Sequence, residues 1–213
     1  MAWYNRAAMN RVKVSVIYYS STGTNYQMAQ EAVQAAEQAG AEVRLRRVRE
    51  LAPVEAINQR PEWKAHLEAT RDIPEATLDD IDWADVIALS TPTRFGLVSA
   101  QMKQFLDSTG SLWAQGKLTN KVMTFMTSAQ NPHGGQEMTL LSLFVVAAHW
   151  GAILVPPGYT APAIFEAGGN PYGTSATPQP GGLPESKIRA VHHQIQRAVQ
   201  IAEWLIRGRE ATQ

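Results

Sequence analysis

The chain has 213 residues, of which 45% are apolar, and its nineteen basic residues balance nineteen acidic ones. A formal net charge of zero excludes a global field that would recruit nucleic acid or an anionic membrane, so the expected partners are small molecules or further copies of the chain. The absence of cysteine excludes disulfides, thiolate catalysis and structural zinc, and a redox function would therefore need a cofactor.

The length and the absence of an obvious linker predict one α/β domain over residues 12–208. Residues 1–11 are expected to be an N-terminal extension and residues 209–213 a C-terminal tail. The extension lacks the apolar run of a signal peptide, and nowhere do eighteen apolar residues follow one another. These features predict a cytoplasmic protein without membrane insertion.

The first predicted strand, Lys13 to Tyr18, leads through a hydroxyl-rich turn, Ser20 to Asn25, into a helix predicted over 26–39. The free backbone N–H groups at a helix start and the serine and threonine hydroxyls can together hold a phosphate. The turn has no lysine for a P-loop and only one glycine, too few for the GxGxxG dinucleotide motif. It predicts a bound, unreactive phosphate monoester such as that of FMN, although the same residues also cap ordinary helices.

The next strands differ in their patterns. Residues 42–48 alternate apolar side chains with arginines, which is typical of an edge strand, whereas 86–89 and 122–126 are continuous apolar runs typical of central strands. Helices at about 100–109, 135–150 and 185–207 and a fifth strand at 153–155 complete the alternation. This order predicts a flavodoxin-like, doubly wound, five-stranded parallel sheet of strand order 2-1-3-4-5 with helices on both faces.

In such a sheet, ligands bind where the carboxyl ends of strands one, three and four meet. The segments that leave these strands are 20–25, 91–96 and 128–135, and all three have the composition of binding loops. A further Gly/Pro-rich stretch, 156–184, is predicted to be a long loop. We expect it to cover either the binding pocket or a neighbouring subunit, and a role in assembly alone is the alternative.

These motifs resemble the WrbA-type NAD(P)H:quinone oxidoreductases, the tryptophan-repressor-binding protein family. The most specific matches are TPTRFG from Thr91, QMKQFLDSTGSLWAQGKL from Gln101, GGQE from Gly134, and the run Ala148-His149-Trp150-Gly151. The resemblance implies a flavodoxin-like fold, noncovalent FMN, NADH or NADPH as electron donor, and a homotetramer or dimer. The implied reaction is ping-pong, two-electron reduction of quinones to hydroquinones, and the implied role is protection against oxidative stress.

The resemblance also implies roles for individual residues. Phe95 and Trp113 would form aromatic walls for the quinone, and His149 would complete the flavin pocket and help to protonate the quinol. Trp113 could instead fill a gap or a subunit contact, and His149 could merely cap a helix. The residues implied to bind FMN are Ser20, Ser21, Thr22, Gly23, Thr24, Asn25, Pro92, Thr93, Arg94, Phe95, Gly96, Ser128, Ala129, Gln130, Asn131, His133, Gly134 and His149.

One residue departs from the family pattern. Thr22 stands where the family often has an aromatic residue that is proposed to contact the nicotinamide nucleotide, and this makes the loop similar to that of a carrier flavodoxin. A flavodoxin-type carrier of single electrons is therefore the second hypothesis, although carriers are usually strongly acidic. A non-catalytic regulatory or adaptor flavoprotein ranks third, because the sequence has no basic recognition helix.

Overall fold

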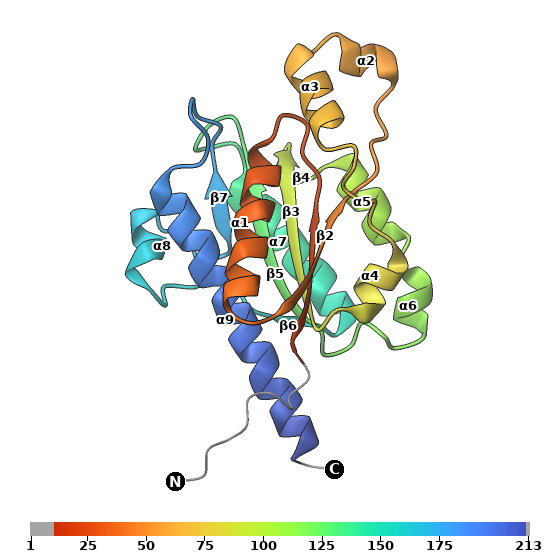
Figure 1. Ribbon diagram of the computed structural model, residues 1–213, viewed down its shortest axis with the longest axis vertical. Helices are drawn as coiled ribbons and strands as arrows, with labels where there is room; N and C mark the ends of the chain where they lie inside the picture. The colour runs from red at the N-terminus through yellow and green to blue at the C-terminus, as the bar shows by residue number, and fades with distance from the viewer. Residues whose placement is uncertain (1–10, 212–213) are drawn as a thin grey trace.

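A computed structural model of the chain describes residues 11–211 and shows a central sheet between two layers of helices (Figure 1). Of the predicted N-terminal extension, all but Arg11 lies outside the described residues. The five main strands are β1 (Lys13–Tyr18), β2 (Glu42–Arg47), β3 (Val86–Arg94), β5 (Val122–Ser128) and β6 (Ile153–Leu154).

These five strands are parallel and lie in the order β2-β1-β3-β5-β6, which confirms the predicted order of 2-1-3-4-5. β5 is buried along its whole length and β3 at every residue except Arg94, as expected for strands covered on both faces. β2 is the half-exposed edge strand. Two of its arginines, Arg44 and Arg46, contact the buried Asp80 of α4 (Leu78–Trp83), and the third, Arg47, pairs with Glu75.

The sheet has two short strands that the sequence did not reveal. β4 (Leu97–Val98) forms an antiparallel hairpin with the end of β3, and β7 (Thr174–Ala176) is parallel to the end of β5. β6 pairs with the first residues of β5 and β7 with its last residues. The two short strands therefore lie one after the other along the same side of β5. Strands of two or three residues are too short to show an alternating pattern, which is why both were missed.

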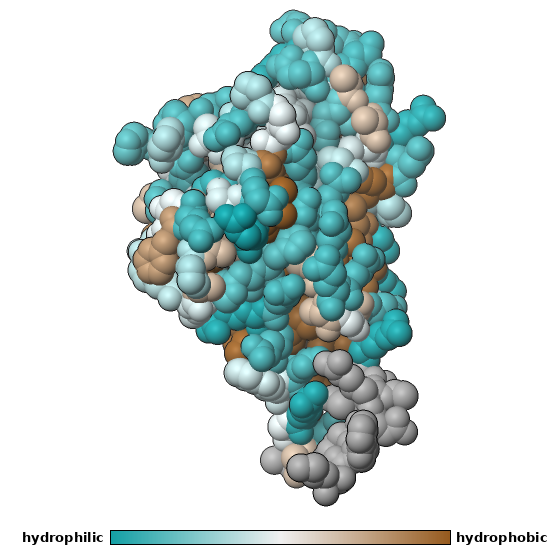
Figure 2. Space-filling model, turned by 60° about the vertical axis from the view of Figure 1, so that its left-hand side comes forward, coloured by the Kyte–Doolittle hydropathy of each residue, from teal (hydrophilic) through white to brown (hydrophobic). Residues whose placement is uncertain are grey.

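The prediction of one continuous loop over 156–184 is therefore wrong in part. This segment holds β7 and also α8 (Pro162–Glu166). Tyr159 and Phe165 stack with ring centroids 5.0 Å apart, yet both remain more than half exposed. The face drawn in Figure 2 is mostly hydrophilic, with apolar side chains in small separate groups.

Helices α1 (Thr24–Gln38) and α9 (Glu185–Glu210) cover one face of the sheet (Figure 1). Small side chains such as Ala32, Ala36 and Ala198 are buried between them, which lets the two helices approach closely. α9 continues to Glu210, three residues beyond the predicted end, so the expected tail at 209–213 begins inside this helix. No helix among residues 11–211 combines the length and apolar character that crossing a bilayer requires.

The opposite face is covered by α4 (Leu78–Trp83), α5 (Ala100–Asp107), α6 (Gly110–Ala114) and α7 (Gln136–Trp150). Its core joins Ile81, Phe105 and Leu140 to the strand residues Ile87 and Phe125, all of them buried. The predicted helices at 100–109 and 135–150 correspond to α5 and α7. Because α7 runs antiparallel to β5, it begins at the carboxyl end of the sheet and ends at the amino end.

Between β2 and α4 the chain makes an excursion that contains α2 (Val54–Asn58) and α3 (Pro61–Ala69). We call residues 50–76 the α2–α3 arm. In Figure 1 this arm lies at the top of the view, beyond the carboxyl ends of the strands. It is therefore placed next to the edge of the sheet where the predicted binding loops meet.

Candidate functional site

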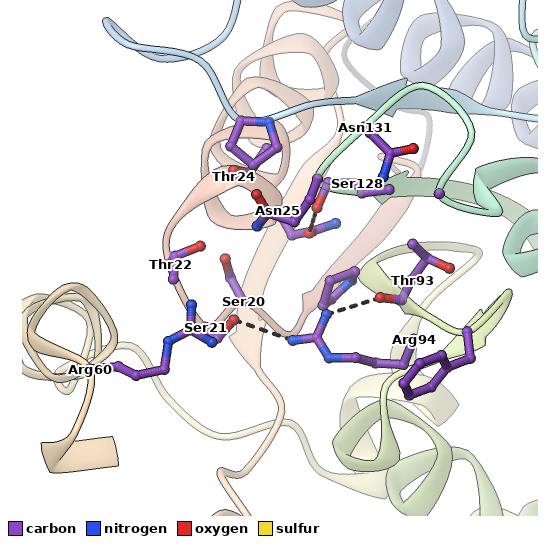
Figure 3. A pocket seen from close by; sticks show the side chains of 16 residues that line it. Ser20, Ser21, Thr22, Thr24, Asn25, Arg60, Thr93, Arg94, Ser128 and Asn131 are labelled. Atoms are coloured by element: carbon purple, nitrogen blue, oxygen red, sulfur yellow. Dashed lines mark hydrogen bonds between the residues drawn. The ribbon is translucent and has the colours of Figure 1, made fainter. Parts of the chain in front are cut away.

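A cavity of about 480 Å³ lies at the carboxyl ends of β1, β3 and β5, and its size is in the range of small-molecule sites (Figure 3). Residues from all three predicted loops line it, and only Arg60 and Pro178 come from elsewhere. The lining residues are Ser20, Ser21, Thr22, Thr24, Asn25, Arg60, Pro92, Thr93, Arg94, Phe95, Ser128, Ala129, Gln130, Asn131, Gly134 and Pro178.

The first loop turns sharply into helix α1. Gly23 has a φ of 105°, a left-handed conformation that glycine adopts without strain, and its N–H donates to the Ser20 hydroxyl over 3.0 Å. α1 begins at Thr24, so the free N–H groups of its first turn lie beside the hydroxyls of Ser20, Ser21 and Thr22. Such a combination of amide and hydroxyl donors fits a phosphate.

Asn25, in the first turn of α1, is hydrogen-bonded to the ends of β3 and β5. The side-chain amide of Asn25 donates to the Ser90 hydroxyl over 3.1 Å, and the Ser90 hydroxyl donates to the backbone carbonyl of Asn25. The side-chain oxygen of Asn25 accepts from the Ser128 hydroxyl over 2.5 Å. All three residues are buried. The side chain of Asn25 is thus engaged within the protein, and it holds α1, β3 and β5 at fixed distances around the cavity.

The second loop is not the irregular loop that the sequence suggested, because β3 continues through Thr91, Pro92 and Thr93 to Arg94. β1 pairs with β3 only as far as Ser90, so the part that holds Pro92 is paired with β5 alone and tolerates a missing N–H donor.

Only Phe95 and Gly96 form the turn to β4, and both have positive φ, 53° and 81°, as in the tight turns that match strand twist. Phe95 is fully exposed at the tip of this hairpin. A large aromatic residue in a left-handed conformation is strained, and such strain gathers at functional sites. This ring is available to pack against a planar ligand in the cavity.

Two side chains fix the hairpin beside the other loops. Arg94 donates from Nη1 to the carbonyl of Thr93 and from Nη2 to the hydroxyl of Ser21 over 3.4 Å. Thr93 in turn accepts a hydrogen bond from Thr139 of α7. The guanidinium of Arg94 therefore lies between the hairpin and the first loop (residues 20–25), as Figure 3 shows.

The third loop, which follows β5, closes on itself. The Asn131 carbonyl accepts from Gly134 N–H and from the Gln136 side chain, and the Asn131 side chain accepts from His133 N–H. There is no room for a side chain at Gly135, whose Cβ would lie 2.9 Å from the Cα of Gly96. This contact brings the third loop directly against the hairpin.

The electrostatic character of the cavity favours an anion. Its lining holds two arginines, Arg60 and Arg94, and no carboxylate. Beneath the first loop, burial lowers the pKa of His66, whose ring lies 5.6 Å from that of Tyr26. Among residues 11–211 no group of histidines and carboxylates could hold a metal ion. Hydroxyl and amide donors, arginines and an exposed aromatic ring together suit a phosphorylated planar ligand such as FMN.

Three predicted residues lie beside the cavity without lining it. Gly23 and Gly96 shape their turns, and the exposed His133 contributes its backbone N–H to the third loop. Two further lining residues were not named from the sequence. Pro178 follows β7 in the 156–184 stretch, for which a covering role over the pocket was one of the expectations, and Arg60 comes from the excursion between β2 and α4, where no local pattern marks it.

Within one chain the structure does not bring His149 or Trp113 to this cavity, and the expectation that His149 completes the flavin pocket stays a prediction. α7 starts beside the cavity at Gln136 and is continuous to Trp150, so His149 lies about 20 Å away at 1.5 Å of rise per residue. Trp113 is at that same far end, where its Nε1 donates to the His149 carbonyl over 3.0 Å. Both side chains are exposed.

Comparison with known proteins places the chain in a family. The family model described as NADPH-dependent FMN reductase matches residues 12–166. A protein of Deinococcus radiodurans named NAD(P)H dehydrogenase (quinone) is 52% identical over 195 residues, which cover 92% of this chain and 98% of the relative. A protein of the same name from Aromatoleum aromaticum is 38% identical and covers 94% of this chain and 100% of the relative.

Solved structures agree on the fold. A flavodoxin, WrbA-like protein from Agrobacterium tumefaciens superposes with a TM-score of 0.65 at 22% identity, covering 91% of this chain and 98% of that one. An archaeal flavodoxin superposes with a TM-score of 0.60 at 14% identity, covering 90% and 99%. The residues matched by the family model, 12–166, include β1, β3 and β5 and the three loops of the cavity. The chain is therefore a flavodoxin-like member of the NADPH-dependent FMN reductase family.

Proposed function

We propose that this protein is an FMN-dependent NAD(P)H:quinone oxidoreductase. The observation that carries the proposal is the convergence of three binding loops on one anion-favouring cavity at the switch point of the sheet. Relatives of 52% and 38% identity that bear the name NAD(P)H dehydrogenase (quinone) support the reaction class. FMN is the cofactor, and NADH or NADPH is the electron donor.

Bound FMN supplies the redox chemistry, two-electron transfer as hydride from NAD(P)H to a quinone. The chain's own residues bind and orient it. Ser20, Ser21, Thr22 and Thr24 hold the phosphate with hydroxyls and the N-terminus of α1, while Arg94 places a positive charge beside them. Phe95 packs against a planar ring, and the third loop offers amides from Gln130 and Asn131 to polar ring atoms.

The active site is completed by a second copy of the chain. Trp113 and His149 are exposed and hydrogen-bonded together, but they lie at the end of the molecule remote from the cavity. In a homodimer or homotetramer they could reach the cavity of a neighbouring subunit, where Trp113 would flank the quinone and His149 would donate a proton to the quinol. The exposed Tyr159–Phe165 pair is a second surface suited to subunit contact.

The carrier hypothesis differs in what it requires of the surface. A single-electron carrier needs an exposed flavin and a docking face for a protein partner, and its acidic surface guides that docking. This chain has zero net charge, and its cavity is lined by Arg60 and Arg94 with no carboxylate among the lining residues. The enzyme therefore ranks above the carrier, and the regulatory hypothesis has no structural feature in its support.

The need for a nicotinamide nucleotide leads us to assign the protein to the cytoplasm, where this donor is regenerated. Two-electron reduction of quinones there would contribute to protection against oxidative stress.

Steady-state kinetics test the function. With FMN-loaded protein, the rate of NADPH or NADH oxidation is measured while NAD(P)H and benzoquinone are varied together. Parallel double-reciprocal lines would support a ping-pong quinone reductase. A protein that binds FMN but oxidises neither nucleotide would be a carrier or a regulator, and the proposal would be abandoned.

A further inference from the structure

Arg60 is the one charged residue of the cavity that comes from outside the three loops. It is the residue before α3, in the α2–α3 arm, and it lies at least thirty-one positions along the sequence from every residue of the three loops. Figure 3 shows its side chain reaching from the arm toward Ser21 and Thr22. Arg60 therefore faces the first loop from the side opposite to Arg94.

The guanidinium of Arg60 has hydrogen-bond donors that its contacts within the described residues do not use. Its Nε and Nη2 both contact a single oxygen of Glu62, over 3.2 and 3.1 Å, and no contact of Nη1 is found among the described residues. Both side chains of this pair are about half exposed. An exposed ion pair of this kind contributes little stability, so Glu62 does not prevent Arg60 from turning to a stronger anion.

The arm that carries Arg60 is fixed to the body of the protein through Glu50. Its carboxylate accepts from the Tyr19 hydroxyl of β1's end, from Trp63 Nε1 of α3 and from the Gln101 amide of α5. Leu51 and Ala52 add backbone N–H donors. Of these five donors, Tyr19 connects the arm to the residue before the first loop and Gln101 connects it to α5, while the other three belong to the arm itself. The fold therefore sets the position of the arm, and of Arg60, near that loop.

A second contact joins the arm to the loop. His66 of α3 packs against Tyr26 of α1, and a Cβ at Gly23 would lie 3.8 Å from its Nδ1. The arm thus covers the outer side of the loop. A phosphate held there would have Arg94 on one side and Arg60 on the other, with no carboxylate among the residues that line the cavity.

We propose that Arg60 is a phosphate-binding residue of the oxidoreductase, supplied by the α2–α3 arm to a phosphate monoester at the first loop. A planar guanidinium binds phosphate oxygens through two parallel hydrogen bonds, which lysine cannot do. The phosphate belongs either to FMN or to NADPH, which differs from NADH by one phosphate monoester. The nucleotide case rests on the proposed function, whereas the FMN case does not.

The test compares Arg60→Ala with the wild-type protein and with Lys64→Ala. Lys64 is an exposed basic residue of the same helix that does not line the cavity, so it is a matched control. The dissociation constants of FMN and riboflavin are measured by flavin fluorescence, and the KM values of NADPH and NADH are measured at saturating FMN. Thermal unfolding of each apoprotein checks the fold.

If the phosphate is that of FMN, Arg60→Ala weakens FMN binding by about tenfold and leaves riboflavin binding unchanged. If it is that of NADPH, FMN binding stays constant and the KM of NADPH rises by a similar factor while that of NADH does not. Arg60→Lys is expected to show a smaller loss than Arg60→Ala in either case. Lys64→Ala is expected to bind FMN and to use NADPH as the wild-type protein does.

If Arg60→Ala weakened the binding of FMN and of riboflavin equally, the substitution would have disturbed the shape of the flavin site rather than removed a contact to the phosphate. That result would overturn the proposal. So would FMN binding and NADPH kinetics that stay within twofold of wild type. Because flavin binding needs no turnover, a phosphate-specific loss in a protein without reductase activity would keep Arg60 as a phosphate-binding residue and reject only the proposed function.

Discussion

Trp113 donates a hydrogen bond from its indole to the carbonyl of His149, at the end of the sheet opposite to the cavity. Both residues match family motifs for the active site, yet about 20 Å of continuous helix separates His149 from the cavity of its own chain. In the oligomer that we propose, these two residues would instead reach the cavity of a neighbouring subunit.

Replacement of Trp113 by alanine should therefore lower kcat/KM for quinone by about tenfold, the equivalent of about 1.4 kcal/mol, with FMN affinity unchanged. Trp204 of α9 is the matched control, since it is exposed to nearly the same extent, 55% against 59%, and lies on another face. Trp204→Ala should leave quinone kinetics unaltered. An equal loss in both variants would argue for a nonspecific effect of removing surface tryptophans.

Mixed oligomers test the exchange between subunits directly. Gly23→Val should abolish FMN binding, because a β-branched residue cannot adopt a φ of 105° without strain. Co-expression of this variant with Trp113→Ala would place an intact Trp113 beside an intact FMN site. Activity above that of Trp113→Ala alone is expected, and activity no higher than that would mean that Trp113 acts within its own chain or not at all.

Asn25 should matter for stability as well as for the site. Asn25→Ala would remove the acceptor of the buried Ser128 hydroxyl and the amide that donates to the buried Ser90 hydroxyl, at a cost of about 1–3 kcal/mol in the free energy of unfolding, while Ser90 would still donate to the backbone carbonyl of residue 25. Asn25→Asp would add a negative charge beside the phosphate loop and should weaken FMN binding further. Urea denaturation of the apoproteins and FMN titration measure the two effects. A fully stable Asn25→Ala protein would show that these hydrogen bonds are replaceable.

The contact between Gly135 and Gly96 predicts a steric effect. In Gly135→Ala the new Cβ would lie 2.9 Å from the Cα of Gly96, at a φ of 90°, so the hairpin that carries Phe95 must shift. We expect a loss of about 1–3 kcal/mol of stability together with weaker FMN binding. Gly110→Ala is the control, because nothing lies within 4 Å of its Cβ and its φ is ordinary. Unchanged FMN binding in Gly135→Ala would separate the hairpin from the flavin site.

Glu50 gives the molecule an acid-sensitive contact. Burial raises its pKa, but hydrogen bonds from Ala52, Gln101 and Tyr19 outweigh this effect and hold the pKa below its ordinary value. A carboxylate whose pKa is lower in the folded state stabilises the fold above its unfolded pKa, near 4.3, and this contribution is lost as the pH falls through the folded pKa.

The difference in Tm between wild type and Glu50→Gln should therefore be constant from about pH 8 to pH 5 and should shrink below about pH 4. At neutral pH the substitution should cost about 1–3 kcal/mol, because one amide oxygen cannot accept from five donors. Glu55→Gln, an exposed change in the same arm, serves as the control. A Tm difference that does not vary with pH would assign the effect of Glu50 to packing alone.

The sequence was sufficient to predict the order of the five main strands, because continuous apolar runs and an arginine-rich alternation distinguish central strands from an edge. It also indicated the three segments around the cavity, since Ser20, Thr93 and Ser128 lie at or just beyond the carboxyl ends of strands that must meet. It could not indicate Arg60, because no local pattern shows which surface residue of a long excursion folds back over a loop. For Trp113 and His149 the family motif implied a site, but only the length of α7 shows that one chain cannot bring them there.

Anaerobic stopped-flow of the FMN-loaded protein shows whether the bound flavin carries electrons from NAD(P)H to a quinone. Flavin absorbance is followed on mixing with NADPH or NADH, and the reduced protein is then mixed with benzoquinone. We expect rapid loss of the oxidised flavin spectrum on mixing with the nucleotide, and its full recovery with one equivalent of quinone. Loaded protein whose spectrum neither nucleotide changes within the time of a catalytic turnover would contradict an NAD(P)H:quinone oxidoreductase.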